Sequence, residues 1–162
     1  RAELIVKSNP VQPWDCPERQ QATTAFAQRW RDRPVILDAW FAMEASAPFG
    51  DGIARADALL VDPAFDPNAP NSLRAVLGGF GRCAEHFHRS DGRGYQWMAE
   101  QLVAVDQRNP IAASRMLKLF MGWRRYSPER QQLMRSSLEW LAENLTSPNS
   151  KEVVMLCLGA AD

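Results

Sequence analysis

Apolar residues recur at helical spacing through most of this 162-residue chain, and this periodicity constrains its fold more than any other feature. Apolar side chains that fall every three or four positions lie on one side of an α-helix. The stripes are Ala22, Phe26 and Trp30; Tyr95, Met98, Leu102 and Val105; Met116, Leu119 or Phe120, and Trp123; and Met134, Leu138, Leu141 and Leu145. The pattern predicts amphipathic helices that each bury one face.

Capping residues mark where these helices begin. Asp91 is a candidate N-cap because a short side-chain carboxylate accepts hydrogen bonds from the free N–H groups of a first turn. Asn109-Pro110 and Ser127-Pro128 each combine a capping side chain with proline at the first helical position. Residues 15–18 and 149–152 have the pattern of a capping box and predict two further helix starts.

The helices and their short connections predict an all-α fold with one domain over residues 1–162. Strand patterns are almost absent. The one proline-rich break, residues 61–70, is a connector within the domain. Connections of two to five residues favour antiparallel neighbours, so we expect an α-solenoid of about four helix hairpins, of HEAT or armadillo type. The expected helices span residues 2–8, 16–31, 34–46, 51–60, 71–82, 93–107, 110–125, 128–145 and 150–159.

Composition argues against several classes of protein. The hydrophobic content of 46% and charged content of 23% are those of a globular domain. A formal net charge of zero argues against a nucleic-acid partner. No apolar run approaches the ~18 residues of a membrane span, so we expect no membrane partner.

The cysteines and the first residues predict where the protein resides. Cys16, Cys83 and Cys157 are odd in number and widely spaced, which favours reduced thiols in a cytoplasmic protein. The sequence from Arg1 to Lys7 has neither a signal-peptide pattern nor an initiator methionine. We therefore expect a fragment of a longer polypeptide.

Several short motifs together resemble the C-terminal helical domain of bacterial-type aminopeptidase N, the zinc metallo-aminopeptidases. No single motif is specific, but their order and spacing are, over roughly residues 16 to 158. They are Asp38-Ala39-Trp40-Phe41, Asn71-Ser72-Leu73-Arg74, Gly78-Gly79-Phe80, Phe87-His88, Asp91-Gly92-Arg93-Gly94-Tyr95, Asn109 to Arg115, and Trp123-Arg124-Arg125-Tyr126.

The resemblance implies a function for the chain within a larger enzyme. It would pack against the catalytic domain, cover the active-site cleft, limit access to peptides and contact substrate. The parent enzyme would remove N-terminal amino acids from peptides with a zinc ion. The partners implied are the other domains of the same polypeptide and peptide substrates. The alternative is a stand-alone HEAT-like scaffold that binds a protein or peptide and has no enzymatic role.

This chain is not expected to hold the metal or to be catalytic. A zinc site of the family type needs H-E-x-x-H on a helix, whereas His86 and His88 are two positions apart and would point to different faces. They are expected to be structural or exposed. Cys83 beside either histidine would be a rival hydrolase site, but the spacing gives that no specific support.

Arg74 and Arg115 are the candidate substrate-contact residues. Each lies among apolar neighbours, where an unpaired guanidinium would be costly to bury. Arg115 could pair with an acid of this domain, for which the candidates are Asp106, Glu100 and Glu139. Alternatively, both arginines face a chamber and meet an anionic group of a peptide; the resemblance implies positions that face the active-site cavity.

The remaining motifs have structural explanations. The two glycines after Asp91 suit a tight turn rather than a phosphate loop. The basic-aromatic residues 123–126 end a helix, where cations suit the helix dipole. The tryptophans predicted to lie in the core are Trp30, Trp40, Trp97, Trp123 and Trp140.

Overall fold

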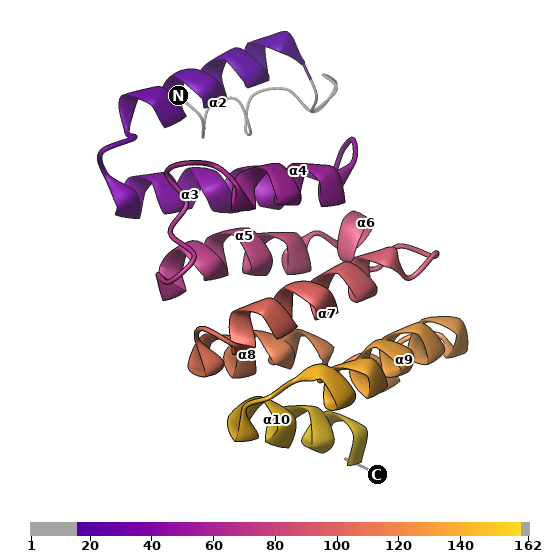
Figure 1. Cartoon of the computed structure of the whole chain (residues 1–162). Helices are drawn as coiled ribbons and strands as arrows, with labels where there is room; N and C mark the ends of the chain where they lie inside the picture. Colours follow the sequence, from indigo (N-terminus) through magenta and orange to yellow (C-terminus); the bar gives the residue numbers. More distant parts are fainter. Residues whose placement is uncertain (1–15, 160–162) are drawn as a thin grey trace.

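The computed structural model describes residues 16–159, and all regular structure in that range is helical (Figure 1). The all-α prediction is confirmed. The helix expected at residues 2–8, and Asp15 of the first capping box, lie outside the described residues. The helices are α2 (Pro17–Arg29), α3 (Pro34–Ala45), α4 (Gly52–Leu60), α5 (Pro70–Arg82), α6 (Ala84–Phe87), α7 (Arg93–Asp106), α8 (Pro110–Met116), α9 (Pro128–Asn144) and α10 (Pro148–Gly159), with 3-10 turns η1 (Leu117–Phe120) and η2 (Trp123–Arg125).

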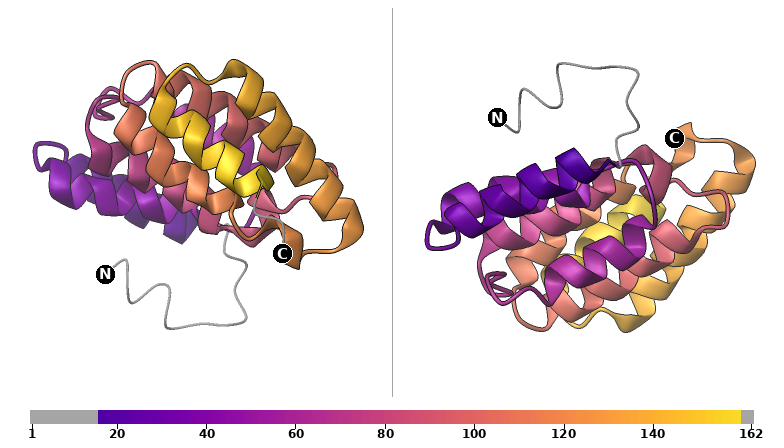
Figure 2. Two further views of the ribbon diagram at one scale, coloured as in Figure 1. Left: turned by 90° about the horizontal axis from the view of Figure 1, so that it is seen from below. Right: turned by 90° about the horizontal axis from the view of Figure 1, so that it is seen from above.

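The helices stack in sequence order from α2 at one end to α10 at the other (Figure 1). The successive pairs are α2–α3, α4–α5, α7–α8 and α9–α10. One layer follows the contacts of α3 with α5, α5 with α8, and α8 with α10, while α7 packs beside α9 in the other. In views along the stack the helices run in similar directions (Figure 2). This arrangement is the predicted α-solenoid.

The core forms where the predicted stripes meet. All residues of the stripe on α7 and of the stripe on α9 are buried, as predicted. In the stripe after Asn109, Met116 and Trp123 are buried. Of the two alternatives between them, Phe120 is buried and Leu119 is half-buried. Each fully buried apolar side chain of this size contributes about 1.5–3 kcal/mol to folding. Apolar burial therefore holds the stack together from α3 to α10.

α5 packs very closely against α3 and η1 because two of its glycines lack side chains. A Cβ atom at Gly79 would lie 2.9 Å from the Cβ atom of Ala45 and 3.0 Å from the carbonyl oxygen of Ala42. A side chain at Gly81 would collide with Leu119 on the other side of α5. The helix thus sits between α3 and η1 with its backbone close to both.

The prediction of which face of α2 is buried is wrong. Ala22, Phe26 and Trp30 are only half-buried, and the buried residues are Arg19, Thr23 and Ala27. The reason is a charged contact: two nitrogens of Arg19 donate to the carboxylate of Glu44 on α3, at 2.9 and 3.4 Å. Periodicity of apolar residues cannot predict a helix face that is turned inward by a buried ion pair.

The helix predicted over residues 110–125 ends early. α8 stops at Met116, and the chain continues as η1 and η2. The Trp123 indole and the Arg124 guanidinium both donate to carbonyl oxygens at the end of α10, which draws this segment away from a continuous helix. Among the five tryptophans predicted as core, Trp97 and Trp123 are buried, Trp30 and Trp40 are half-buried, and Trp140 is exposed.

Predicted caps are only partly correct. Asn109 accepts a hydrogen bond from the backbone N–H of Ala112, as expected. Before α7 the N-cap position is taken by Gly92 at φ 74°, and Asp91 accepts from the backbone N–H of Arg93 from one position further out. Ser127 occupies the N-cap position of α9 but makes no capping bond with its side chain.

The start of α10 depends on a residue some 40 positions upstream. The capping box predicted at residues 149–152 is wrong, because α10 begins at Pro148. The buried carboxylate of Asp106 instead accepts from the backbone N–H groups of Thr146 and Ser147, each at 2.9 Å. Both hydroxyls donate to it as well. Burial alone would raise the pKa of Asp106, but these hydrogen bonds outweigh it and lower the pKa to about 2.

Replacing Gly79 with alanine should destabilise the fold. Alanine favours helix by about 1 kcal/mol, but overpacking against the α3 backbone costs about 1–3 kcal/mol. We expect a net loss of up to about 2 kcal/mol in the free energy of unfolding, measured by urea denaturation. Gly122→Ala is the matched control, because a Cβ atom there meets nothing within 4 Å. Equal stability of the two variants would contradict the close-packing account.

Asp106 should make stability depend on acid pH. Its folded pKa lies below the ordinary value of 3.8, so its contribution is complete above about pH 4 and is lost as pH falls towards about 2. The loss is expected to be about 2 kcal/mol, from the size of the pKa shift. Asp106→Ala should lower stability at neutral pH by about 2–4 kcal/mol and remove this part of the acid dependence.

The control for Asp106 is Glu152→Ala, which changes an exposed acid on α10. Its unfolding free energy should stay within about 0.5 kcal/mol of the unchanged protein. Parallel stability curves between pH 4 and pH 2 for Asp106→Ala and the unchanged protein would show that the carboxylate does not hold α10.

Candidate functional site: a cationic groove between α5 and α8

One face of α5 carries positive charge while the opposite face is buried. Arg74, Gly78 and Arg82 are spaced by four residues, so they align along one side of the helix. Both arginines are exposed, whereas Val76 and Phe80 on the other side are fully buried. Because Gly78 has no side chain, the Arg82 guanidinium can lie over it, with one nitrogen 3.3 Å from where a Cβ atom would be. The core packing of α5 therefore fixes which way its cations face.

The neighbouring α8–η1 segment presents a second pair of cations. Arg115 and Lys118 are three residues apart and are both exposed. The Asn109 cap fixes the start of α8, and the contact between Gly81 and Leu119 sets η1 beside the last turn of α5. α5 and α8 thus lie side by side, with η1 next to the last turn of α5.

Together these segments enclose a groove of about 410 Å³. Its lining residues come from α5, α8 and η1, and from Asn109 just before α8. They are Pro70, Asn71, Arg74, Gly78, Arg82, Asn109, Ile111, Ala112, Arg115, Met116, Lys118 and Leu119. A second groove of about 250 Å³ adjoins it towards α3 and shares Asn71, Arg74 and Arg82 with it. The two predicted site residues, Arg74 and Arg115, thus line one groove.

The charge in the larger groove is of one sign. It has four cationic side chains and no carboxylate among its lining residues. None of the four forms an ion pair within residues 16–159. Arg74 donates to the side-chain oxygen of Asn71 at 2.9 Å, which orients the guanidinium without neutralising it. In the smaller groove the acid is Asp38, which accepts a hydrogen bond from Ser72 at 2.7 Å.

The acids expected to pair with Arg115 are engaged elsewhere. Asp106 holds the start of α10, Glu139 pairs with Arg135 at 2.8 Å, and Glu100 accepts from Gln96 at 3.0 Å. Arg74 and Arg115 are both exposed, so neither guanidinium is buried among its apolar neighbours. Water therefore solvates both guanidinium groups, and no internal partner is required.

The sequence contained a signal for Arg82 and Lys118 that the motif-based prediction did not use. Arg82 lies eight residues after Arg74, and Lys118 lies three after Arg115, so each falls on the same helical face as a predicted site residue. Only the packing of α5 beside α8 shows that the two faces meet.

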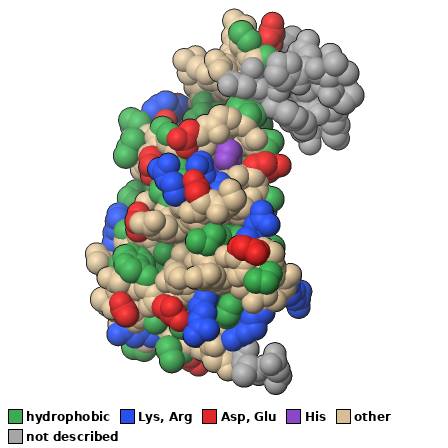
Figure 3. Space-filling model, turned by 90° about the vertical axis from the view of Figure 1, so that its right-hand side faces the viewer, with side chains coloured by type: hydrophobic (Ala, Val, Ile, Leu, Met, Phe, Trp, Pro, Cys, Tyr) green, Lys and Arg blue, Asp and Glu red, His purple; other side chains and the backbone are tan. Residues whose placement is uncertain are grey.

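The side of the stack shown in Figure 3 carries acidic and basic side chains next to one another. Among the described residues outside the groove, Arg89 and Asp91 form an ion pair at 2.7 Å. Such mixed charge differs from the groove, whose lining has cations and no acid.

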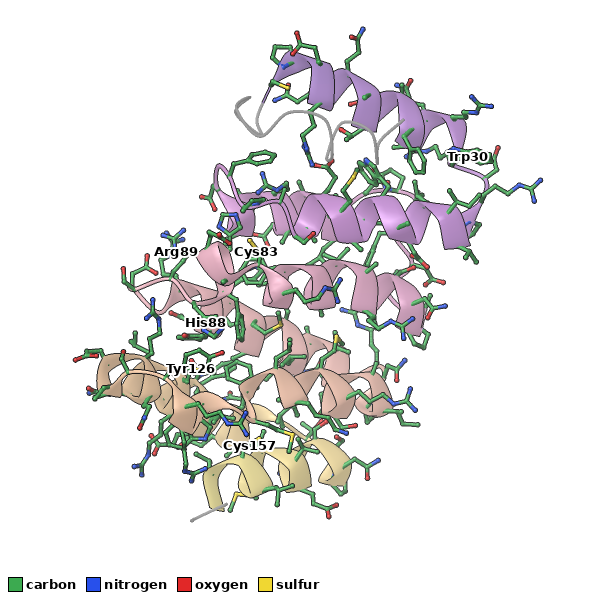
Figure 4. All side chains as sticks on the ribbon, turned by 180° about the vertical axis from the view of Figure 1, so that it is seen from behind. Trp30, Cys83, His88, Arg89, Tyr126 and Cys157 are labelled. Atoms are coloured by element: carbon green, nitrogen blue, oxygen red, sulfur yellow. The ribbon has the colours of Figure 1, made fainter. Side chains whose placement is uncertain are left out.

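The two histidines have separate structural roles. The His86 ring is buried against Phe80, and its Nε2 atom lies 3.0 Å from the carbonyl oxygen of Ala47. A side chain at Gly52 would collide with this ring. His88 stands beside Tyr126, as Figure 4 shows, with ring centroids 4.5 Å apart. Within residues 16–159, no group of three His, Cys, Asp or Glu side chains is placed to hold a metal ion.

Cys83 does not have the surroundings of a nucleophile. Burial raises its pKa, which keeps the thiol protonated at neutral pH. Its sulfur lies 3.5 Å from a carboxylate oxygen of Glu85, and the rings of His86 and His88 contact Ala47 and Tyr95 rather than this sulfur. Cys16, Cys83 and Cys157 are all free thiols, and Figure 4 shows Cys83 and Cys157 far apart.

None of the described helices is both long enough and apolar enough to span a bilayer.

Comparison with known protein families shows which family the chain belongs to. The family described as "Domain of unknown function (DUF3458_C) ARM repeats" matches residues 9–159. The chain belongs to this family. The predicted resemblance to the C-terminal helical domain of aminopeptidase N is confirmed by the relatives as well.

Curated relatives are much longer proteins. Aminopeptidase N of Caulobacter vibrioides is 38% identical over 143 residues, which cover 87% of this chain and 17% of the relative. Aminopeptidase N of Escherichia coli is 32% identical over 133 residues, or 80% of this chain and 15% of the relative. This member of the ARM-repeat family thus spans about one sixth of the length of these aminopeptidases.

A solved structure has the same fold. Aminopeptidase A of Legionella pneumophila, crystallised in complex with aspartic acid, matches with a TM-score of 0.85 and 30% identity. The match covers 91% of this chain and 17% of that protein. The helical stack described above is therefore a domain found within larger aminopeptidases.

His88 should make stability depend on pH near neutrality. Its Nδ1 atom lies 2.7 Å from the hydroxyl of buried Tyr95, and Tyr126 and Arg130 are the other polar groups beside it. Burial, followed by the charge of Arg130, lowers the pKa of His88. The neutral ring is thus favoured in the folded state. Its contribution is complete above the unfolded pKa of about 6.5 and is lost as pH falls below it.

The measurement is the free energy of unfolding between pH 7.5 and pH 5 for the unchanged protein and for His88→Gln. Stability of the unchanged protein should fall towards pH 5, and the variant should show a flatter profile. A variant with the same slope as the unchanged protein would contradict the assignment to His88.

Proposed function

We propose that this chain covers the active-site cleft of a zinc aminopeptidase, limits access to peptides and contacts substrate through its cationic groove. The observation that carries the proposal is the convergence of Arg74 and Arg115 on one groove that has no acid. It is supported by the relatives and the solved structure of the same fold, all of which are aminopeptidases.

The groove chemistry suits the carboxyl end of a peptide. Guanidinium groups bind carboxylates with two parallel hydrogen bonds, and such charge-assisted bonds are stronger than neutral ones. Arg74 is already oriented by Asn71, so less conformational entropy is lost when it binds. The arginines are solvated in this chain alone, but a covering catalytic domain would exclude water and strengthen the same contacts.

A helical cover over the cleft also acts as a sieve for size. A peptide can thread into a roofed chamber, whereas a folded protein cannot bring its terminus to the reacting atoms. The chamber would exclude water from the peptide bond that is cleaved. This chain would supply walls and charge to the chamber, and the peptide would be hydrolysed elsewhere in the polypeptide.

The described residues do not fit a zinc ion, since they bring no three ligands together. We place the metal and its Lewis-acid chemistry in another part of the parent polypeptide. Reading the sequence encoded upstream of Arg1 tests this. We expect H-E-x-x-H followed by a further glutamate, whereas a start codon close to Arg1 would favour the stand-alone scaffold.

We also propose a cytoplasmic location. All three cysteines are free, and Cys83 and Cys157 are buried in positions too far apart to form a disulfide. Fractionation of cells followed by immunoblotting tests this, and recovery of the protein from a secreted fraction would contradict it.

Replacing either Arg74 or Arg115 with alanine in the full-length enzyme should raise KM for tri- and tetrapeptides. Loss of one charge-assisted hydrogen bond to a carboxylate costs about 1.5–3 kcal/mol, which corresponds to a ~10- to 100-fold rise in KM. The effect should be small for a chromogenic amino-acid amide, which has no carboxylate to reach the groove.

Arg125→Ala is the matched control, because Arg125 is exposed on η2 and does not line the groove. Its KM values should match those of the unchanged enzyme. Unchanged KM for peptides in both groove variants would remove the substrate-contact idea while leaving the fold and the family intact.

A further inference from the structure

Two cations of the groove are not needed to hold a single carboxylate. Arg82 and Lys118 line it together with Arg74 and Arg115, yet two bidentate guanidinium groups already fill the lone-pair sites of one carboxylate. Four cations close together repel one another, which is unfavourable unless anionic groups lie between them. The surplus charge therefore indicates a second anionic group in the ligand.

The surplus cations come from two segments, Arg82 from the end of α5 and Lys118 from η1, and both line the groove. The Arg82 guanidinium turns back towards Arg74: a Cβ atom at Gly78 would lie 3.3 Å from an Arg82 guanidinium nitrogen and 3.5 Å from Cγ of Arg74. Arg74 lies two helical turns back along α5, about 12 Å from Arg82 measured along the axis. Arginine and lysine side chains are long enough to reduce this separation to a few ångströms between bound anions.

A separation of a few ångströms matches the distance between a peptide's terminal carboxylate and the side-chain carboxylate of an acidic residue at or near that end. An extended peptide advances about 3.3 Å per residue, so side chains of the last two residues lie within reach of Arg82 when the terminus lies at Arg74 and Arg115. The smaller groove, which shares Arg74 and Arg82, gives such a side chain additional room.

We propose that Arg82 and Lys118 make the groove selective for peptides that carry Asp or Glu at their last or next-to-last position. This inference rests on the proposed function, because it needs the terminal carboxylate to sit at Arg74 and Arg115. It adds a substrate class: short peptides with an acidic carboxyl end. Neither cation forms an ion pair within the described residues, so both are available to a ligand.

The test compares matched peptides in the full-length enzyme. Ala-Ala-Ala-Glu is compared with Ala-Ala-Ala-Gln, and Ala-Ala-Glu-Ala with Ala-Ala-Gln-Ala, so that only one charge changes. We expect KM to be about three- to tenfold lower for the acidic member of at least one pair, a range typical of a solvent-accessible charged contact. Increasing salt should reduce the ratio.

The variants are Arg82→Gln and Lys118→Gln, singly and together. The double variant should bring the Glu-to-Gln ratio to about 1, because KM rises more for the acidic peptides than for the neutral ones. Lys151→Gln and Arg125→Gln remove exposed cations away from the groove and should keep the ratio. Far-ultraviolet circular dichroism checks that each variant is folded.

Three outcomes would overturn the inference. A ratio near 1 in the unchanged enzyme would overturn it, and so would a ratio that persists in the double variant. An equal rise in KM for acidic and neutral peptides would mean that these cations contact another part of the polypeptide.

The same assay separates this inference from the proposed function. Amidation of the peptide carboxyl end should raise KM if Arg74 and Arg115 hold the terminus. If amidation has no effect, the proposed function fails and the inference fails with it. If amidation weakens binding but Glu and Gln peptides are equivalent, only the inference fails.

Discussion

The close approach of α5 to its neighbours determines where the positive charges of the groove lie. Gly79 lets α5 lie against α3, and Gly81 lets η1 lie against the opposite side of α5. With these contacts made, the buried face of α5 cannot rotate, and the face that carries Arg74 and Arg82 must point into the groove. The positions of the cations thus follow from apolar packing and from two missing side chains, without any ion pair to orient them.

Two buried charged groups outside the groove have partners within the described part of the domain. The guanidinium of Arg19 binds Glu44, and the carboxylate of Asp106 binds the first backbone groups of α10. The groove is different because its cations have no acidic partner among residues 16–159. Although the net charge of the chain is zero, the described residues thus form a groove lined by positive charge alone. Under the proposed function, that surface lies next to the chamber that receives peptides.

Most of the fold could be predicted from the sequence because it is built from local signals. Apolar periodicity located the helices and the buried faces of α7 and α9, and the Asn109-Pro110 pair located the start of α8. The errors occur where distant residues decide the outcome. Asp106 sets the start of α10 from 40 positions away, Glu44 turns α2, and the carbonyls of α10 end the helix that follows Asn109.

The candidate site was predictable only in part for the same reason. Arg74 and Arg115 were found through a resemblance between motifs, but their exposure and their common groove depend on the packing of α5 beside α8. Arg82 and Lys118 share helical faces with them, yet nothing local to the sequence shows that those faces meet.

The most direct measurement is a crystal structure of the full-length polypeptide with a non-hydrolysable peptide analogue bound. The account predicts that the groove faces the catalytic site, with a carboxylate oxygen of the analogue within hydrogen-bonding distance of Arg74 or Arg115. A groove that opens to bulk solvent on the side away from the catalytic site would contradict it.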